Sequence, residues 1–428
     1  MQLWKKVLIG LVLGVITGYL MKTNMKPADV GLYSLYLKQA GVVFINLIMM
    51  IVAPLIFFSL VAGVNNLKDG DSLGRIGWKA TIAYMGTSMF AIAMGLTVAT
   101  LVDPGLGFSF EAKDAEVAKA ELPEIAKILM NIIPTNAVGS FAGVSAKSNT
   151  VQVVFFAIFV GVVLNFMGKK GKNLVTFCTD AANLMFEMIA VIIKIAPIAV
   201  FGLMAWVTAT TGFDAIEKLA LLVACTVGAV TLHYVLLGIA FFLINGISPI
   251  SFYKKSFEYQ ALAFSTTSSK ATLATAMRVA EDKIGISKES SSFILPLGAA
   301  INMDGTAIYL GICAVFFAGV FGVDLTTMDY IMVVFTATVA SIGAAGYPGG
   351  SLVMMGLVLS VIGLSPEQTA LGVGFIAAVD RILDMFRTTI NVTSDVAICS
   401  MIDKSEGRFD EEKYHTPIAK LRTYSKPE

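Results

Sequence analysis

Long apolar runs separated by short polar connections make up the first part of the chain, as far as about Leu243. Most of these runs approach the roughly 20 residues that a helix needs to cross the hydrocarbon core of a bilayer. Their length and apolar character predict membrane-spanning helices. The predicted spans are Val7–Met21, Val42–Val64, Ala80–Val102, Val151–Met167, Leu184–Val207 and Leu219–Leu243.

After about Ser251 the simple alternation of apolar and polar segments ends. Phe252–Ile284 contains the polar run FSTTSSKATLATA, and Leu325–Leu364 contains the glycine-rich break SIGAAGYPGGS between two apolar arms. Two interrupted segments in corresponding places are typical of discontinuous helices around a transport site. The backbone groups that such breaks release are tolerated in a membrane only where protein buries them or where they line a polar cavity.

Two further spans complete this half of the chain, at Ser291–Phe321 and at about Gln368–Ile402. The first contains NMDGT at Asn302–Thr306, where a glycine beside an aspartate predicts local unwinding that releases carbonyl oxygens as ligands. Beyond the second span, we expect residues 403–428 to be a charged, solvated and partly disordered cytoplasmic tail. No soluble domain is apparent, so we predict one membrane domain over residues 1–428. About residues 1–245 would be mainly scaffold with part of the transport domain, and about residues 250–403 the transport core.

The stretch Asp380–Asp395 places ionisable side chains inside the last predicted span. At about 100° per residue, its polar residues fall on one narrow stripe, and the opposite face is apolar enough to lie against lipid or packed helices. The stripe consists of Asp380, Asp384, Arg387, Thr388, Asn391 and Asp395. Charged groups at that depth are costly, so they usually face a bundle interior and mark a pathway for ions or substrate.

The composition supports a membrane location and excludes other classes of protein. The chain is 56% hydrophobic and 14% charged, with a mean hydropathy of +0.79, whereas soluble domains are roughly 45–50% apolar. A formal charge of +1 and the lack of a basic patch argue against nucleic acid as a partner. The four widely spaced cysteines fit small buried residues better than a disulfide or metal framework. With only two histidines, a histidine-rich metal centre is not expected.

The charges between the predicted spans indicate an orientation. The N-terminus has a basic start, but its apolar run is long and no small-residue cleavage site follows, so we interpret it as a retained first span. With a cytoplasmic N-terminus, Arg75, Lys79 and Lys169 lie on the cytoplasmic side and the acidic loop around Glu121 on the other, as the positive-inside rule favours. We therefore expect a multi-pass protein of the cell membrane.

Several motifs together resemble the glutamate transporter family, the dicarboxylate/amino acid:cation symporters, in its prokaryotic type. They are the serine-rich run Ser265–Lys270, NMDGT, AGYPGG at Ala345–Gly350 and DMFRTTINVTSD at Asp384–Asp395, with IIPTN and APIAVFGLM as supporting matches. The resemblance covers nearly the whole chain. It implies an all-α membrane fold of eight transmembrane helices plus two re-entrant helical hairpins in inverted repeats, a homotrimer, and an elevator-type movement. The hairpins would be Phe252–Ile284 and Leu325–Leu364, the latter gating the substrate.

Arg387 is the residue that most directly indicates the substrate class. A guanidinium presents paired donors that match a carboxylate, and the resemblance implies that Arg387 binds the side-chain carboxylate of an acidic amino acid. An internal ion pair with Asp384 at i, i+3 is the alternative. Asp384 would suit the α-ammonium group. The resemblance implies that the remaining substrate contacts come from Ser268, Ser269, Thr306, Tyr347, Thr388 and Asn391.

Asp304 and Asp395 are candidate cation ligands, because hard ions such as sodium take carboxylate and carbonyl oxygens. The resemblance implies three sodium sites. One comprises Asp395 with backbone oxygens of Gly298, Asn302 and Asn391; one Asp304 with Tyr84, Thr87, Ser88 and Asn302; and one the carbonyls of Ala300, Ser341, Ile342 and Ala344. The alternative is that the aspartates are protonated in a dry core, which would favour proton coupling.

The sequence departs from the family where many members carry an additional arginine. Thr267 and Met385 stand at those positions, and the nearest cations are Lys270 and Arg381. We expect Asp380 and Arg381 to pair with each other or to contact Lys270. Tyr347 is bulkier than the small aliphatic residue usual at the hairpin tip, which would alter gating or narrow the substrate choice.

The leading hypothesis is a sodium-coupled symporter of L-glutamate or L-aspartate, with sodium as coupling ion and no other cofactor. A proton-driven symporter of dicarboxylates, or of neutral or cystine-like amino acids, is the alternative. An ion channel would need polar pore-lining rings without tight substrate ligands. We predict no enzyme activity, because the sequence offers no nucleophile and base with an orienting group.

Overall fold

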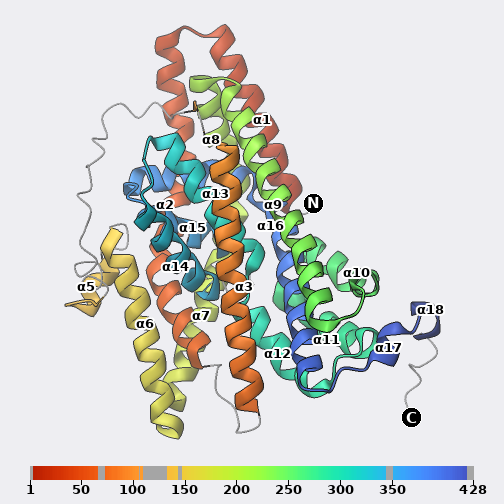
Figure 1. The fold of residues 1–428 in the computed structure, drawn as a ribbon. Helices are drawn as coiled ribbons and strands as arrows, with labels where there is room; N and C mark the ends of the chain where they lie inside the picture. Colours follow the sequence, from red (N-terminus) through yellow and green to blue (C-terminus); the bar gives the residue numbers. More distant parts are fainter. Residues whose placement is uncertain are drawn as a thin grey trace.

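The structure is a computed structural model in which every regular element of the described residues is a helix (Figure 1). The described residues are 3–65, 73–105, 107–108, 133–142, 147–343 and 350–421. Within them, four helical stretches are long and apolar enough to cross a membrane: Lys5–Asn24, Arg75–Val102, Ile216–Asn245 and Lys288–Phe321. The last is almost wholly buried and passes through the centre of the molecule.

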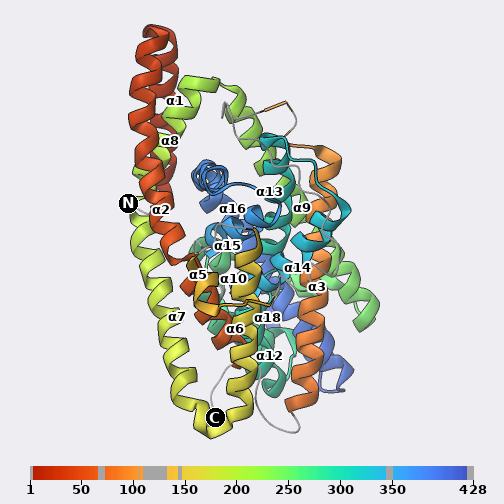
Figure 2. The same ribbon diagram turned by 90° about the vertical axis from the view of Figure 1, so that its left-hand side faces the viewer.

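The N-terminal half builds a long column at one side of the molecule, formed by α1, α2, α7 and α8 (Figure 2). The helices of the N-terminal half are α1 (Leu3–Asn24), α2 (Pro27–Asn65), α3 (Leu73–Val102), α5 (Ala137–Ala142), α6 (Lys147–Met167), η1 (Gly168–Gly171), α7 (Lys172–Ile192), η2 (Ile193–Ile195), α8 (Ala196–Thr211) and α9 (Asp214–Asn245). Glycines at four-residue spacing on α1 explain its packing on α8. A Cβ atom at Gly10, Gly14 or Gly18 would overlap carbonyl oxygens of α8, so the two backbones meet as small residues allow.

Two predicted spans differ from the observed helices. The span expected at Leu184–Val207 is broken into α7 and α8 by the short 3₁₀ turn η2. Pro197 at the start of α8 explains the break, since proline lacks an N–H donor and restricts the residue before it. The helix expected to begin at Val42 begins at Pro27, because its less apolar first turns are held by packing against α8, which a hydropathy count does not register.

The C-terminal half contains the predicted interruptions within 252–284 and at NMDGT, whereas residues 344–349 of the predicted glycine-rich break lie outside the described residues. Its helices are α10 (Pro249–Thr266), α11 (Ser269–Val279), η3 (Ala280–Ile284), α12 (Lys288–Ile301), α13 (Asp304–Phe321), α14 (Thr327–Gly343), α15 (Gly350–Val361), α16 (Pro366–Ser405), α17 (Glu411–His415) and α18 (Ile418–Leu421). Thr267 turns the chain between α10 and α11 with a φ of 54°. Asn302 and Met303 have non-helical backbone between α12 and α13, so the predicted unwinding at NMDGT is confirmed.

The described residues after α16 are mostly exposed or half-buried, as the expectation of a solvated tail predicts, but Tyr414 is fully buried. The Tyr414 ring packs near Phe241, and its hydroxyl accepts a hydrogen bond from the backbone N–H of Phe252 at 2.9 Å and donates to the carbonyl of Ser248 at 2.6 Å. One aromatic residue in a charged segment anchors it to the first turns of α10.

Candidate functional site

The polar stripe of α16 lies in the interior, as its spacing predicts. Asp380, Asp384, Arg387, Thr388, Asn391 and Asp395 are all at most 7% exposed. The stripe runs beside the break between α12 and α13 and divides into two clusters. We call them the arginine cluster, around Arg387, and the oxygen cluster, around Asp304 and Asp395.

In the arginine cluster, a fully buried guanidinium meets two carboxylates of its own helix. Arg387 Nη2 donates to Asp380 Oδ1 at 2.9 Å and lies 3.2 Å from Asp384 Oδ1. The guanidinium carbon lies 4.0 Å from the centre of the Tyr309 ring of α13, whose hydroxyl donates to Asp380 Oδ1 at 3.1 Å. Asp380 therefore pairs with Arg387, and our expectation of a pair with Arg381 is wrong, because successive helix residues do not face each other.

The same cluster leaves buried polar atoms without hydrogen bonds. Arg387 Nε, Arg387 Nη1 and Asp384 Oδ2 have no hydrogen-bond partner in the described part of the chain. Arg381 Nη1 approaches Asp384 Oδ2 only to 3.9 Å. Each unsatisfied buried group costs about 1–3 kcal/mol, and a charged group costs more. A ligand that carries both an acceptor and a donor could satisfy these atoms and remove that cost. Counted with Arg381, the two carboxylates and two guanidinium groups leave the cluster formally neutral.

Two further predicted substrate residues belong to the arginine cluster or the helix break. Thr388 Oγ1 donates to Asp384 Oδ1 at 3.4 Å. Both amide atoms of Asn391 are engaged at the break, since Oδ1 accepts from Gly305 N at 2.7 Å and Nδ2 contacts Met303 Sδ at 3.3 Å. Asn391 therefore ties α16 to the non-helical backbone.

The other predicted substrate residues differ in what the structure says of them. Ser268 caps α11 by accepting from Ala271 N, while Ser269 is buried and its hydroxyl has no hydrogen bond within the described chain. Thr306 lies buried in the first turn of α13. Tyr347 lies outside the described residues.

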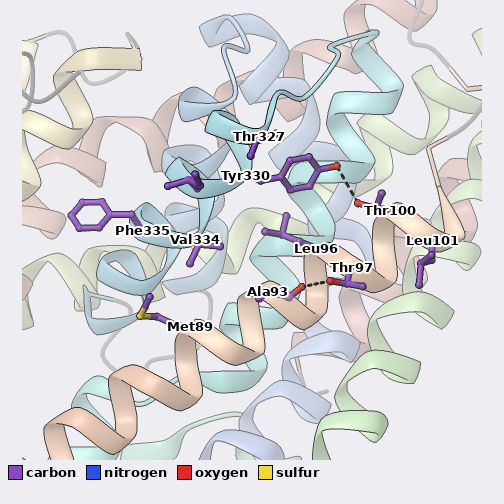
Figure 3. Close-up of a pocket in the computed structure, with 11 residues that line it drawn as sticks. Met89, Ala93, Leu96, Thr97, Thr100, Leu101, Thr327, Tyr330, Val334 and Phe335 are labelled. Carbon is purple, nitrogen blue, oxygen red and sulfur yellow. Dashed lines mark hydrogen bonds between the residues drawn. The ribbon is translucent and has the colours of Figure 1, made fainter. Parts of the chain in front are cut away.

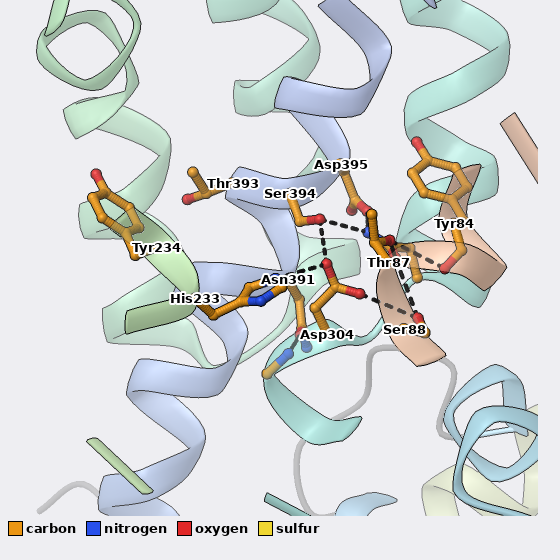
Figure 4. A network of polar contacts seen from close by, with 12 residues as sticks. Tyr84, Thr87, Ser88, His233, Tyr234, Asp304, Asn391, Thr393, Ser394 and Asp395 are labelled. Atoms are coloured by element: carbon orange, nitrogen blue, oxygen red, sulfur yellow. Dashed lines mark hydrogen bonds and ion pairs between the residues drawn. The ribbon is translucent and has the colours of Figure 1, made fainter. Parts of the chain in front are cut away.

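The oxygen cluster gathers side chains from four helices around Asp304 at the start of α13 (Figure 4). Asp304 Oδ1 accepts from Ser88 Oγ of α3 at 3.2 Å, and Oδ2 accepts from Ser394 Oγ of α16 at 2.5 Å. His233 Nε2 of α9 lies 3.2 Å from the same Oδ2. All four residues are at most 3% exposed, so the carboxylate is held inside protein by three donors.

Asn302 links this carboxylate to the second one. Its Nδ2 donates to Asp395 Oδ1 at 2.9 Å and to Ser394 Oγ at 3.2 Å, while its Oδ1 accepts from Thr87 at 3.3 Å. The non-helical conformation of Asn302 makes this bridge possible, because its side chain reaches both α3 and α16. Carboxylate, amide and hydroxyl oxygens of this kind are the ligands that hard cations prefer.

Gly298 makes room for the second carboxylate. A Cβ atom at this position would lie 2.6 Å from Asp395 Oδ1 and 2.6 Å from the Tyr84 hydroxyl. Tyr84 itself donates to the carbonyl of Ile294 at 3.1 Å. Glycine is therefore required for α12, Tyr84 and Asp395 to meet this closely.

The third predicted cation site is only partly described. Ala300 lies near the end of α12, and Ser341 and Ile342 lie in the last turn of α14. Ala344 lies outside the described residues. Over the described ranges, no three His, Cys, Asp or Glu side chains gather as a metal-binding group.

A large groove lies apart from both clusters, between α3 and α14 (Figure 3). Its volume is about 800 Å³, and its lining is apolar, with Leu96, Val334 and Phe335 among the lining residues. Among its polar lining residues, Thr100 and Tyr330 form a hydrogen bond between their hydroxyl groups at 3.1 Å. The lining of the groove includes no charged group, so the candidate site is the pair of polar clusters and not this groove.

Sequence reasoning missed three members of the clusters. From the sequence, His233 serves only in an argument against a metal centre, and no role is assigned to Tyr309 or Ser394. A lone imidazole in a membrane span was a usable signal, since ionisable residues there are rarely without a partner. The other two carry no signal that separates them from ordinary helix residues.

Interrupted membrane helices that bring buried carboxylates, an amide and a guanidinium together define a membrane transporter. The family model of the sodium:dicarboxylate symporter family matches residues 3–405, so the chain belongs to that family. The predicted family is thereby confirmed.

Relatives of known name are similar over nearly their whole length. The chain is 32% identical to the proton/sodium-glutamate symport protein of Bacillus subtilis (strain 168), over 98% of this chain and 96% of that protein. It is 33% identical to the protein of the same name from Bacillus caldotenax, over 97% of each. It is also 31% identical to C4-dicarboxylate transport protein 2 of Mesorhizobium japonicum, over 98% of this chain and 92% of that protein. The names of these relatives therefore give two classes of substrate, the amino acid glutamate and the C4-dicarboxylates.

Proposed function

We propose that the protein is a secondary active symporter that takes up L-glutamate or L-aspartate together with sodium ions. The observation that carries this proposal is the arginine cluster, in which Arg387 and Asp384 keep buried atoms free for a ligand of mixed charge. The guanidinium suits the side-chain carboxylate of the substrate. Asp384 suits its ammonium group, and Ser268, Ser269, Thr306, Thr388 and Asn391 would complete the contacts.

The charge of Asp384 favours an amino acid over a plain dicarboxylate. A C4-dicarboxylate would bring a second carboxylate to the position of the ammonium group, next to the free Asp384 oxygen. Like charges that close in a buried site repel each other strongly. This argument supports the name carried by the Bacillus relatives over that of the Mesorhizobium relative.

The charge of the whole site supports the proposed coupling to cations. An acidic amino acid enters beside the arginine cluster, and the oxygen cluster adds two more buried carboxylates, Asp304 and Asp395. Bound cations would offset this accumulation of negative charge, and the available ligands are oxygens. Asn302 in the helix break donates to Asp395, and Asn391 of α16 accepts from Gly305 N just after the break, so cation and substrate would each favour the same arrangement and bind cooperatively.

The architecture that belongs to this function is a homotrimer in the cell membrane with a cytoplasmic N-terminus. Each subunit would have eight transmembrane helices and two re-entrant hairpins, built on α10 with α11 and on α14 with α15. The packing of α10 on α11 and of α14 on α15 supports the hairpin assignment. The transport core would move against the column of α1, α2, α7 and α8 in an elevator-type cycle.

Uptake into reconstituted vesicles under imposed gradients tests the proposal. With an inward sodium gradient and equal pH on both sides, L-glutamate or L-aspartate should accumulate, whereas succinate should not accumulate and should compete only weakly. Empty vesicles and vesicles with equal sodium on both sides serve as controls. Accumulation that ignores sodium and follows an inward proton gradient, or that favours succinate, would establish the proton-coupled dicarboxylate alternative instead.

A further inference from the structure

His233 is a buried imidazole in the middle of α9, an otherwise apolar helix. It is 3% exposed, and Figure 4 shows its ring pointing from α9 toward Asp304. Nε2 lies 3.2 Å from Asp304 Oδ2. The centre of its ring lies 6.2 Å from the centre of the Phe90 ring of α3. The placement of a polar ring against a single carboxylate oxygen calls for an explanation beyond packing.

The other donors to this carboxylate differ from His233 in one respect. Ser88 follows Thr87 and Ser394 precedes Asp395, so each comes with a proposed cation ligand on its own helix. His233 has no such neighbour on α9. When Asp304 is ionised, as a cation ligand is, Nε2 of His233 donates to it, because an ionised carboxylate only accepts. A nitrogen that carries a proton has no lone pair for a cation. His233 therefore contacts the oxygen cluster without being able to coordinate the ion through this atom.

We propose that His233 is a positioning residue for the cation site. Its Nε2–H holds Asp304 Oδ2 toward α9, so that Oδ1 faces Ser88 and the Asn302 side of the cluster. This inference rests on the proposed function. Groups that orient a ligating carboxylate in this way typically contribute about 10- to 100-fold to metal affinity.

The positioning role predicts that a substitution of His233 changes the half-saturating concentration of sodium but not that of the amino acid. Loss of the hydrogen bond should raise the sodium concentration for half-maximal uptake by about 10-fold. The half-saturating glutamate or aspartate concentration, measured at saturating sodium, should not change, because Arg387 and Asp384 have no contact with His233. A purely structural role would lower the amount of active protein and leave both constants as they are.

The experiment compares His233→Leu with His233→Gln in purified, reconstituted protein. The glutamine amide nitrogen lies as many bonds from Cα as the histidine Nε2, so His233→Gln should restore the sodium dependence of the wild type. Thr231→Val, at an exposed position of the same helix, is the matched control and should behave like the wild type. Stabilisation against thermal unfolding by sodium alone, measured in detergent, gives a second readout that does not depend on transport.

The outcomes separate this inference from the proposed function. If the wild type shows no sodium dependence, the proposed function fails and the inference fails with it. If the wild type depends on sodium but His233→Leu shifts neither half-saturating sodium nor sodium-dependent stabilisation, the inference alone is overturned. Should the leucine variant not fold, His233→Asn replaces it, since its amide nitrogen is one bond too short. Equal sodium dependence of His233→Asn and His233→Gln would then contradict the positioning role.

Discussion

The arginine cluster concentrates the chemistry of the protein in three residues of one helix. Asp384 lies about one helical turn before Arg387, and Asp380 lies about two turns before it. The guanidinium Nη2 is 2.9 Å from Asp380 Oδ1 and 3.2 Å from Asp384 Oδ1. Asp380 Oδ1 receives additional donors from Tyr309 and Ser351. Asp384 Oδ1 receives one from Thr388, and its Oδ2 lies 3.9 Å from Arg381 Nη1. The two carboxylates therefore have different environments. Asp380 is the structural counter-ion of Arg387, and Asp384 keeps an oxygen for another cationic group.

Replacement of Asp384 by asparagine should change what the protein transports. Asp384→Asn removes the negative charge proposed for the ammonium group and leaves the pair of Arg387 and Asp380 intact. Loss of one charged hydrogen bond of about 1.5–3 kcal/mol should reduce the apparent affinity for glutamate or aspartate by about 10- to 100-fold. Competition by succinate should not weaken. Uptake and competition assays at saturating sodium measure both effects.

Arg387→Cys is the contrasting variant, because it removes the group that would bind any acidic substrate. Uptake of amino acids and competition by succinate should both disappear, while the buried Asp380 loses its counter-ion. Tyr309→Phe is the control, since it removes only one donor to Asp380 and keeps the ring beside the guanidinium. Unchanged glutamate uptake by Arg387→Cys would remove Arg387 from the site.

At the scale of helices, the predictable features are those that local sequence imposes. Breaks at Thr267–Ser268 and Asn302–Met303 follow from polar and glycine-containing runs inside apolar stretches, and the interior stripe of α16 follows from its spacing. The split between α7 and α8 and the buried anchor Tyr414 depend on tertiary contacts that hydropathy does not report. The same holds for His233, whose partner Asp304 lies 71 residues away in the chain. Residue type and spacing therefore indicated the stripe but not the residues that hold it from neighbouring helices.

The anchor of the C-terminal segment should contribute measurably to stability. Tyr414→Phe removes the hydroxyl that joins Phe252 N and Ser248 O, leaving a buried donor and acceptor unsatisfied, at a cost of about 1–3 kcal/mol. The melting temperature in detergent should fall, and Glu412→Gln, at an exposed position, should leave it unchanged. Equal melting of Tyr414→Phe and wild type would show that the segment is not held by this hydroxyl.

The contact between α3 and the end of α16 should depend on pH. Hydrogen bonds from Lys79 and then Arg75 lower the pKa of Glu406 below the ordinary value for glutamate. A lowered pKa in the folded state means that the contribution is complete above the ordinary pKa and is lost as the pH falls through the folded value. Wild type and Glu406→Gln should therefore differ in melting temperature at pH 7 and converge in the acid range. Such a surface pair contributes at most about 1 kcal/mol. A difference that grows as the pH falls would contradict this assignment.

For the whole molecule, the two clusters are joined through the break between α12 and α13. Asn391 accepts from Gly305 N in the first turn of α13, and the side chain of Asn302 in the break donates to Asp395, so the residues at this break contact both the proposed substrate and the proposed cation ligands. A ligand that favours one arrangement of this break favours it for the other ligand as well. Coupling between substrate and cation is therefore expected at equilibrium, before any movement of the transport core.

The most direct test of sodium-coupled recognition is the dissociation constant of L-glutamate or L-aspartate for the purified protein, measured by calorimetry over a range of sodium concentrations at constant pH and ionic strength. Because coupling free energies are reciprocal, substrate affinity should rise with sodium by at least about 10-fold, and substrate should raise sodium affinity by the same factor. Choline in place of sodium is the control for ionic strength. A dissociation constant that does not change with sodium but changes with pH would contradict the account.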